Sequence, residues 1–163
     1  MQRRLIFVSP LIIAALFGAQ AQAETVAEKP VEVWASPGIY SHHFNRGKDL
    51  REDNIGPGVE VMLADDHLLM AGSFINSNRA RTHYAAYQWR PLHWQVAGAR
   101  VSAGVVAGVF DGYPNYRNGG AFAVAMPLLA VEGGRFGVNF ALIPTIANRL
   151  DGAIAIQVKL RVW

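Results

Sequence analysis

The residues of this chain best suited to acid–base chemistry are two adjacent histidines and a serine near the ends of predicted β-strands. His42 and His43 lie near the end of the stretch 37–45, and Asn76-Ser77 lies at the end of the stretch 68–76. A neutral imidazole can accept a proton near neutral pH, and a serine hydroxyl can polarise or attack an ester. A plainer interpretation is also open, since such residues are common at strand ends and in loops.

The other histidines do not predict a metal site. His67 stands beside Asp65 and Asp66 in a short break, where such acids are ordinarily solvated, and His83 and His93 have no companions at ligand spacing. The chain has no cysteine, so it has neither thiolate ligands nor disulfides. We therefore predict no metal and no cofactor.

The first residues have the pattern of a secretion signal. Arg3 and Arg4 precede an apolar run from Leu5 to Phe17, and Ala21-Gln22-Ala23 has small residues where a signal peptidase cleaves. The apolar run is too short for a membrane-spanning helix of about 20 residues. The predicted organisation is a signal peptide, an N-terminal segment and one β-barrel domain, over residues 1–23, 24–36 and 37–163.

The charge of the mature chain does not favour nucleic acid as a partner. The whole chain has 15 basic and 12 acidic residues, and removing Arg3 and Arg4 leaves 13 and 12, so the formal charge falls from +3 to +1. A charge this small gives no long-range attraction to a polyanion. We expect no nucleic-acid partner.

Eight stretches that alternate apolar with small or polar residues follow the signal. Such period-two patterning is typical of β-strands with two different faces. The predicted strands are Pro37–Asn45, Ile55–Ala64, Leu68–Asn76, Thr82–Arg90, Gln95–Val109, Gly120–Val131, Phe136–Ile143 and Ala153–Val162.

The clearest apolar rows lie in four of these strands. They are Val59, Val61 and Leu63; Phe122, Val124, Met126 and Leu128; Phe136, Val138, Phe140 and Leu142; and Ile154, Ile156, Val158, Leu160 and Val162. We expect these rows to face lipid. The alternate residues, such as Glu60, Ala123 and Gln157, are then expected to face the lumen.

The breaks between the strands alternate between long and short. The short ones are Ala64–His67, Pro91–Trp94 and Glu132–Arg135. The long ones are Asn45–Asn54, Ser77–Arg81, Phe110–Gly119 and Pro144–Gly152. This rhythm predicts an all-β fold, an eight-stranded antiparallel up-and-down transmembrane β-barrel with all long loops at one end.

A water-soluble, lipocalin-like barrel is the alternative. The last residue bears on the choice, because Trp163 is in phase with Lys159 and Arg161, which we expect to face inward. The final aromatic residue of an outer-membrane barrel usually faces lipid. Either Trp163 leaves the register of its strand or the predicted facing is reversed.

Basic residues concentrate in the predicted long loops, where we expect them to contact the phosphates of lipopolysaccharide. They are Arg46, Lys48, Arg51, Arg79, Arg81, Arg117 and Arg149.

Short sequence matches, in order along the chain, point to one family. They are Trp89-Arg90-Pro91-Leu92, Ala103-Gly104-Val105, Pro127-Leu128-Leu129-Ala130-Val131 and Ile143-Pro144. From Tyr40 to Trp163 the chain resembles the lipid A palmitoyltransferases (PagP), eight-stranded barrels of the bacterial outer membrane. The resemblance implies a monomeric, cofactor-free acyltransferase that moves a palmitoyl-like chain from a phospholipid donor to lipid A.

The resemblance also implies the catalytic residues. His43, with His42 as the alternative, matches the family's essential histidine, and Ser77 matches its serine. The family's aspartate is replaced by Asn76, which can orient an imidazole but carries no negative charge. Three acids of the first long loop are candidates to supply that charge, and no spacing selects among Asp49, Glu52 and Asp53.

In that family the acyl chain enters the barrel from the outer leaflet. Small residues predicted to line the lumen leave room for such a chain, namely Gly104, Gly108, Ala121, Ala123, Ala125, Ala153 and Ala155. Pro37 and Pro144 cannot donate ladder hydrogen bonds, so they are candidate sites of lateral gaps or simple turn residues. A lipid A deacylase and a non-enzymatic lipid-binding or structural barrel remain as alternative functions.

Overall fold

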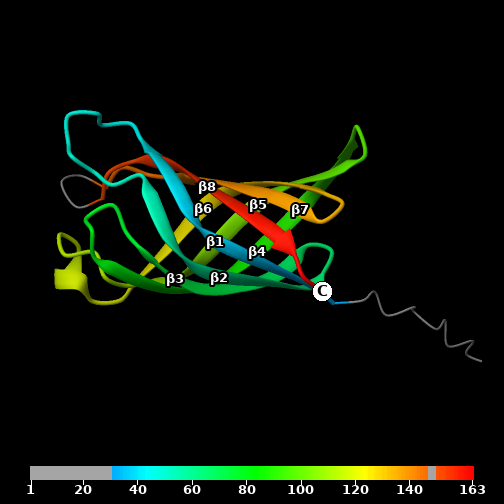
Figure 1. The fold of residues 1–163 in the computed structure, drawn as a ribbon, viewed down its shortest axis with the longest axis horizontal. Helices are drawn as coiled ribbons and strands as arrows, with labels where there is room; N and C mark the ends of the chain where they lie inside the picture. Colours follow the sequence, from blue (N-terminus) through cyan, green and yellow to red (C-terminus); the bar gives the residue numbers. More distant parts are fainter. Residues whose placement is uncertain (1–30, 147–149) are drawn as a thin grey trace, which may run out of the picture.

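The computed structural model describes residues 31–146 and 150–163, which form eight antiparallel strands closed into a barrel (Figure 1). The strands are β1 (Glu32–His43), β2 (Asp53–Ala64), β3 (His67–Ile75), β4 (Arg81–Val96), β5 (Ala99–Phe110), β6 (Phe122–Gly133), β7 (Phe136–Ile143) and β8 (Ala153–Arg161). Each strand pairs with the next along the chain, and β1 pairs with β8. The prediction of an eight-stranded antiparallel up-and-down barrel is confirmed. The predicted signal peptide and Arg149 lie outside the described residues.

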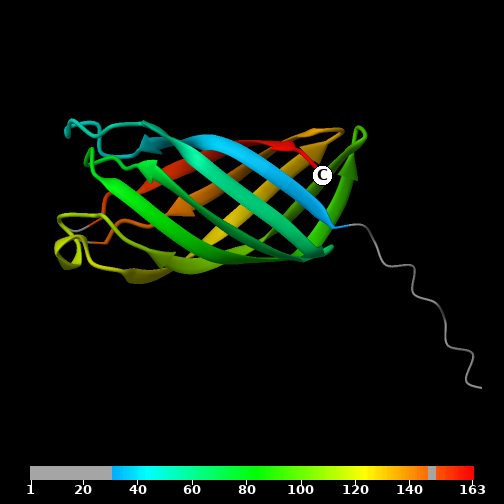
Figure 2. The same ribbon diagram turned by 60° about the horizontal axis from the view of Figure 1, so that its bottom comes forward.

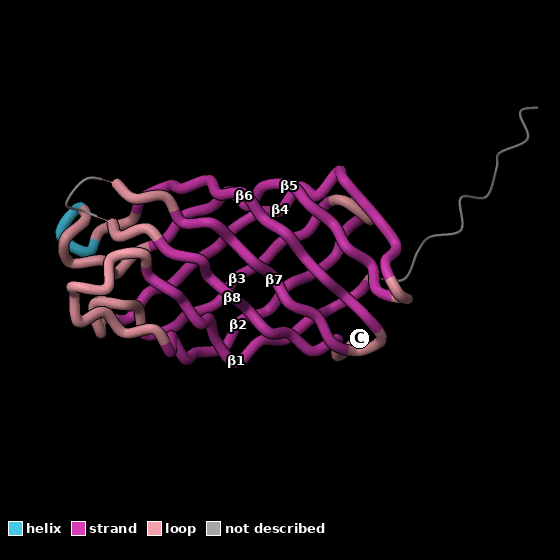
Figure 3. Tube along the Cα trace, turned by 90° about the horizontal axis from the view of Figure 1, so that it is seen from above, coloured by secondary structure: helices cyan, strands magenta, loops and turns pink. Residues whose placement is uncertain are grey.

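The connections differ at the two ends of the barrel (Figures 2 and 3). One end, here called the loop end, has the long connections 44–52, 76–80, 111–121 and 144–152, and the third of these holds a short 3-10 turn, η1 (Arg117–Gly119). The other end, the turn end, has the short connections 65–66, 97–98 and 134–135. Trp163 lies at the turn end, where its carbonyl accepts a hydrogen bond from Val33. No helix in the described ranges is long and apolar enough to cross a membrane.

The turn between β4 and β5 lies later than predicted. The predicted break at Pro91–Trp94 is part of β4, and the chain reverses at Ala97 and Gly98, both with positive φ. Two left-handed residues are typical of a tight hairpin turn. Strand β3 begins at His67, which pairs with Trp89, so β3 does not extend as far as Pro91. Because no β3 carbonyl is there to accept a hydrogen bond, the missing N–H of Pro91 is tolerated inside β4.

Strand β1 begins at Glu32, five residues before the predicted start at Pro37. Pro37 lies inside the strand, at an irregularity where the β1–β2 register shifts between Ser36 and Gly38. On the other side, no β1–β8 pairs form between Ala35 and Tyr40. The absent N–H of the proline thus coincides with an interruption of both ladders.

The barrel is polar inside and apolar outside along β2, β7 and β8, as their alternation predicts. Val59, Leu142 and Val158 are exposed, whereas the alternate residues Glu60 and Gln157 are buried. Among the described residues, more polar than apolar side chains are buried. This distribution is the reverse of that in a domain that folds in water.

Strand β6 has the opposite facing, so the prediction for its two rows is wrong. Phe122, Met126 and Leu128 point into the barrel and are buried. Ala123 and Ala125, expected inside, are exposed. Period-two alternation could not assign this strand, because both of its rows are apolar and only their size differs.

The neighbouring strand explains why the large row of β6 turns inward. In the β5–β6 register Gly104 pairs with Leu128, and Gly108 pairs with Val124. The glycines share the inner face of β5 with the buried Val106. Strand β4 lies close to both glycines, since an added Cβ would be 1.9 Å from the Trp89 carbonyl oxygen at Gly104 and 2.4 Å from Ala86 Cβ at Gly108. On this side-chain-poor wall, Met126 and Leu128 of β6 pack against Val106 and Ala86.

The end of β8 shows which of the two alternatives for Trp163 holds. The strand ends at Arg161, and the Trp163 side chain is 80% exposed. The last residue therefore leaves the register of the strand, and the inward facing of Lys159 stands, since that side chain is buried.

Buried charges fill the lumen of the turn-end half. The Lys159 ammonium donates hydrogen bonds to Glu60 and, at 2.6 Å, to Glu132. Arg90 Nη1 donates to the same oxygen of Glu132 at 2.9 Å. All four side chains are at most 5% exposed. Because such charges are costly to bury, each depends on its partners.

We predict that Glu132→Gln strongly destabilises the barrel, because it leaves Lys159 and Arg90 without their shared carboxylate. The free energy of unfolding, measured by guanidinium chloride titration, should fall by about 3–5 kcal/mol. Asp49→Asn is the control, since it removes an exposed ion pair with Arg79 and should cost less than about 1 kcal/mol. Equal losses in the two variants would contradict this account of the lumen.

Candidate functional site

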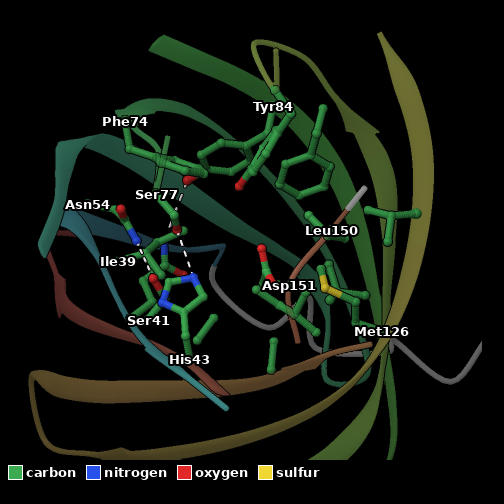
Figure 4. Close-up of a pocket in the computed structure, with 18 of the residues that line it drawn as sticks. Ile39, Ser41, His43, Asn54, Phe74, Ser77, Tyr84, Met126, Leu150 and Asp151 are labelled. Atoms are coloured by element: carbon green, nitrogen blue, oxygen red, sulfur yellow. Dashed lines mark hydrogen bonds between the residues drawn. The ribbon is translucent and has the colours of Figure 1, made fainter. Parts of the chain in front are cut away.

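A cavity of about 130 Å³ lies inside the loop-end half of the barrel (Figure 4). Much of its wall is apolar and aromatic, including the inward row of β6 and the rings of Phe74, Tyr84 and Phe110. Tyr84 and Phe110 stack with ring centroids 5.5 Å apart. Toward the turn end the lining becomes polar, at Gln88 and Asn139. The cavity is therefore suited to an apolar ligand that does not reach the buried charges.

The histidine and serine singled out in the sequence meet at this cavity. His43 is the last residue of β1, and Ser77 lies just beyond the end of β3. Ser77 Oγ and His43 Nε2 form a hydrogen bond of 2.9 Å, and both residues line the cavity (Figure 4). Both are at most 9% exposed. His42, the alternative, has an imidazole that is 53% exposed, outside the cavity lining.

A hydrogen bond between serine and a nitrogen base prepares the serine for nucleophilic attack. The imidazole takes the hydroxyl proton as Oγ bonds to an electrophilic carbon. The arrangement of Ser77 and His43 can thus perform acyl chemistry on an ester whose carbonyl reaches Oγ.

The loop that carries Ser77 is folded around Asn76. The Asn76 carbonyl oxygen Oδ1 accepts hydrogen bonds from the backbone of Asn78 at 2.9 Å and of Ala80 at 3.1 Å. Its amide donates to Thr82 Oγ1 at 3.0 Å and to the Gly112 carbonyl at 2.8 Å. Asparagine side chains commonly close turns in this way.

The resemblance led us to expect that Asn76 orients the imidazole, but it does not. Each polar atom of its side chain is bonded within its own loop, to the start of β4 or to Gly112. It has no hydrogen bond to His43 among the described residues. Its structural role is to hold the Ser77 backbone against the neighbouring loop.

A carboxylate from the first long connection lies beside His43. Glu52 Oε1 is 3.9 Å from His43 Nδ1 and accepts a 3.3 Å hydrogen bond from the His43 backbone N–H. Glu52 Oε2 accepts a 2.9 Å hydrogen bond from the Tyr40 hydroxyl, and Arg46 also binds Oε1. These bonds, that from Tyr40 foremost, lower the pKa of Glu52 to about 2 despite its partial desolvation, so it is ionised at neutral pH.

Two further polar residues near His43 were missed from the sequence. Ser41 and Asn54 line the cavity and are buried, and the Asn54 amide donates to Ser41 Oγ at 2.6 Å. Asn54 Oδ1 is buried without a hydrogen-bond partner in the described part of the chain. No sequence signal separates this pair from other polar strand residues, because their proximity depends on the β1–β2 register.

Most of the basic loop residues expected to bind phosphate already have acidic partners. Lys48 binds Asp151 at 2.8 Å across the mouth of the cavity. The other pairs are Arg46 with Glu52, Arg51 with Asp53 and Arg79 with Asp49. Arg81 and Arg117 are exposed and have no acidic partner within the described ranges.

No group of three or more histidine, aspartate or glutamate side chains is arranged to hold a metal ion in residues 31–146 and 150–163. His67 contacts Tyr87 and Asp66, and His83 contacts Asp111 at 3.2 Å. Both histidines belong to the exposed surface.

No protein-family model matches this chain, and no curated protein matches it by sequence. The resemblance to the lipid A palmitoyltransferases therefore rests on the short matches given above, and the site must be interpreted from its own geometry.

We predict that Asn76→Asp, which introduces the acid that the resembling family has at this position, destabilises the protein. An aspartate has no N–H to offer Thr82 and Gly112, and its charge would be buried against the Gly112 carbonyl. The free energy of unfolding should fall by about 1–3 kcal/mol or more.

Asn45→Asp is the matched control for this change. The Asn45 side chain uses only its oxygen, which accepts from the Gly47 backbone at 3.1 Å, and an aspartate keeps that acceptor. A stable Asn76→Asp variant with increased activity would refute the structural role assigned to Asn76.

Proposed function

We propose that this protein is an outer-membrane acyltransferase, which moves a fatty acyl chain from a phospholipid to lipid A. The observation that carries the proposal is the buried hydrogen bond between Ser77 and His43 at the mouth of an apolar cavity inside a barrel. The expected palmitoyl-like donor chain comes from the family resemblance.

The outer surface of the barrel supports a membrane location. Large apolar side chains are exposed on its outward rows, among them Val59, Leu69, Val109, Phe136, Leu142 and Val158. Monomeric proteins in water rarely expose so continuous an apolar surface, whereas outer-membrane barrels require one. A lipocalin-like barrel would have the reverse facing.

The first chemical step is acylation of Ser77. The Ser77 oxygen attacks the carbonyl of the phospholipid ester, and its proton passes to His43 Nε2. When the tetrahedral intermediate collapses, the ester C–O bond breaks and His43 returns the proton to the departing lysophospholipid. The acyl chain is then joined to Ser77 and lies along the apolar cavity.

The second step transfers the chain to lipid A. His43 Nε2 takes the proton of a lipid A hydroxyl, whose oxygen attacks the acyl–Ser77 carbonyl. The bond from the acyl carbon to Ser77 Oγ breaks, and the serine regains a proton from His43. With water as the acceptor, the same site would be a deacylase.

We place lateral access to the cavity at an interruption of the β6–β7 ladder. The β6–β7 ladder stops at the Leu128–Ala141 pair, so the part of β6 from Phe122 to Pro127 has no β7 partner. Pro127 has no N–H, and Pro144 directly follows β7. Because Val124, Met126 and Ile143 line the cavity beside this interruption, it suits the passage of an acyl chain from the membrane.

The unpaired loop arginines suit an acceptor that carries phosphates. Arg81 and Arg117 are exposed near the loop end, whereas the other described basic residues there are in ion pairs. Arginine forks bind phosphate well, so we place the contact with lipopolysaccharide on these two residues.

We predict that Ser77→Ala and His43→Ala each abolish transfer, because the nucleophile or its base is lost. Lipid A from cells with the wild-type protein should gain one acyl mass, and the variants should reduce this product by at least about 10³-fold. Mass spectrometry of lipid A provides the measurement.

Ser102→Ala and His83→Ala are the matched controls, since Ser102 is buried outside the cavity and His83 is exposed. Both should keep activity. A loss of acyl mass would instead indicate a deacylase, and unchanged lipid A would indicate a non-enzymatic barrel.

We also predict that filling the cavity shortens the transferred chain. Ala141 lies on β7 beside Leu128 and lines the inner part of the cavity. Ala141→Phe should shift the transferred chains toward shorter ones in the mass spectrum. Ala85→Phe adds the same bulk on the outer face and should leave the chain length unchanged. Unaltered lengths in Ala141→Phe would show that the chain does not occupy this cavity.

A further inference from the structure

We infer that Glu52 is the positioning carboxylate of His43, so that Ser77, His43 and Glu52 work together as a serine–histidine–acid triad. The inference rests on the proposed function and deepens it. The family to which the chain is similar has its acid next to the serine, whereas here the acid comes from the connection between β1 and β2.

The free nitrogen of the imidazole is where such an acid is needed. His43 Nε2 is bonded to Ser77, and His43 Nδ1 is buried without a hydrogen-bond partner among the described residues. Glu52 Oε1 lies 3.9 Å from Nδ1, too far for a hydrogen bond but close enough for a direct electrostatic contact. Catalytic hydrogen bonds are often long before substrate binds and shorten in the complex.

Glu52 is held in this place by the chain around His43. Its Oε1 accepts from the His43 backbone, and its Oε2 accepts from the Tyr40 hydroxyl, three residues earlier in β1. Arg46 binds the same carboxylate from the loop. The carboxylate is thus tied to the strand end that carries the imidazole, so small movements of the loop do not separate them.

The other acids of this connection are excluded by their positions. The side chain of Asp49 is 92% exposed and pairs with Arg79, and that of Asp53 is 68% exposed and pairs with Arg51. The side chain of Glu52 is 22% exposed. The structure therefore selects one of the three acids that the sequence left open.

The charge of Glu52 has a defined task in each step. When His43 takes the proton of Ser77 or of the acceptor hydroxyl, the imidazolium carries a positive charge beside Glu52. The carboxylate stabilises that ion and favours the orientation with Nε2 toward the serine. The other charged or titratable groups that act on His43 are Asp151, Arg46 and His42. Asp151 is paired with Lys48, Arg46 binds Glu52, and His42 Nδ1 is 4.0 Å from Glu52 Oε1.

The test compares Glu52→Gln with Asp53→Asn in the full-length protein refolded in detergent with phospholipid and lipid A. Glu52→Gln removes only the charge, and kcat should fall by about 10³–10⁴-fold, as for loss of the acid in serine proteases. Asp53→Asn should stay within about two-fold of wild type, because surface changes have small effects.

The pH profile separates positioning from a merely structural role. Without the carboxylate the protonated imidazole is less stable, so the acidic limb of kcat/KM should move to lower pH by about one unit in Glu52→Gln. Asp53→Asn should leave the limb in place. An unmoved limb in Glu52→Gln, or an activity equal to that of Asp53→Asn, would overturn the inference while leaving the acyl transfer itself intact.

Two measurements that need no lipid A keep the inference testable if the proposed function fails. Labelling of Ser77 by a fluorophosphonate, which reacts with activated serines, should be fast in wild type and much slower in Glu52→Gln. The titration of the His43 imidazole, followed by NMR, should move to lower pH in Glu52→Gln than in the wild type, as the acidic limb of kcat/KM does. Equal labelling rates and equal titrations would refute the role of Glu52, whatever the acceptor proves to be.

Discussion

The closure of eight strands into one hydrogen-bonded ring is the constraint on which the rest of this structure depends. The pairing of β1 with β8 closes the sheet into a barrel, and the four long connections lie at one end. His43 and Ser77 are 34 residues apart in sequence, and they meet because β1 and β3 both end at the loop end of the barrel. The contact between His43 and Ser77 is thus a consequence of strand order and strand length.

The lumen of this ring is divided between two kinds of filling. At the turn end, Glu60, Glu132, Arg90 and Lys159 neutralise one another and exclude an apolar ligand. At the loop end, glycines on β5 lie beside large apolar side chains on the paired strand β6, and aromatic rings line the rest of the cavity wall. The proposed acyl chain therefore has a place only beside the histidine and serine.

At the mouth of the cavity, Asn76 and Glu52 have different roles. Asn76 holds the loop through four hydrogen bonds, a task that an aspartate could not perform with the same donors. The negative charge near His43 comes from Glu52 instead, ionised because Tyr40 and the His43 backbone donate to it. The sequence suggested that Asn76 takes the place of the family's acid near the histidine. In the fold, Asn76 holds the loop and Glu52 supplies the charge.

The sequence by itself determined the number of strands, the long and short connections, and the polar-in facing of β2, β7 and β8, because side-chain alternation and turn residues act locally. It also singled out His43 and Ser77, as residues at strand ends and by the family resemblance, but not their contact. The tertiary structure alone decided the facing of β6, where both rows are apolar and the inward row packs against β4 and β5. It likewise decided the position of the β4–β5 turn, the role of Asn76 and the choice of Glu52. These features depend on contacts between strands and loops whose proximity is set by register, and register is a property of the closed sheet.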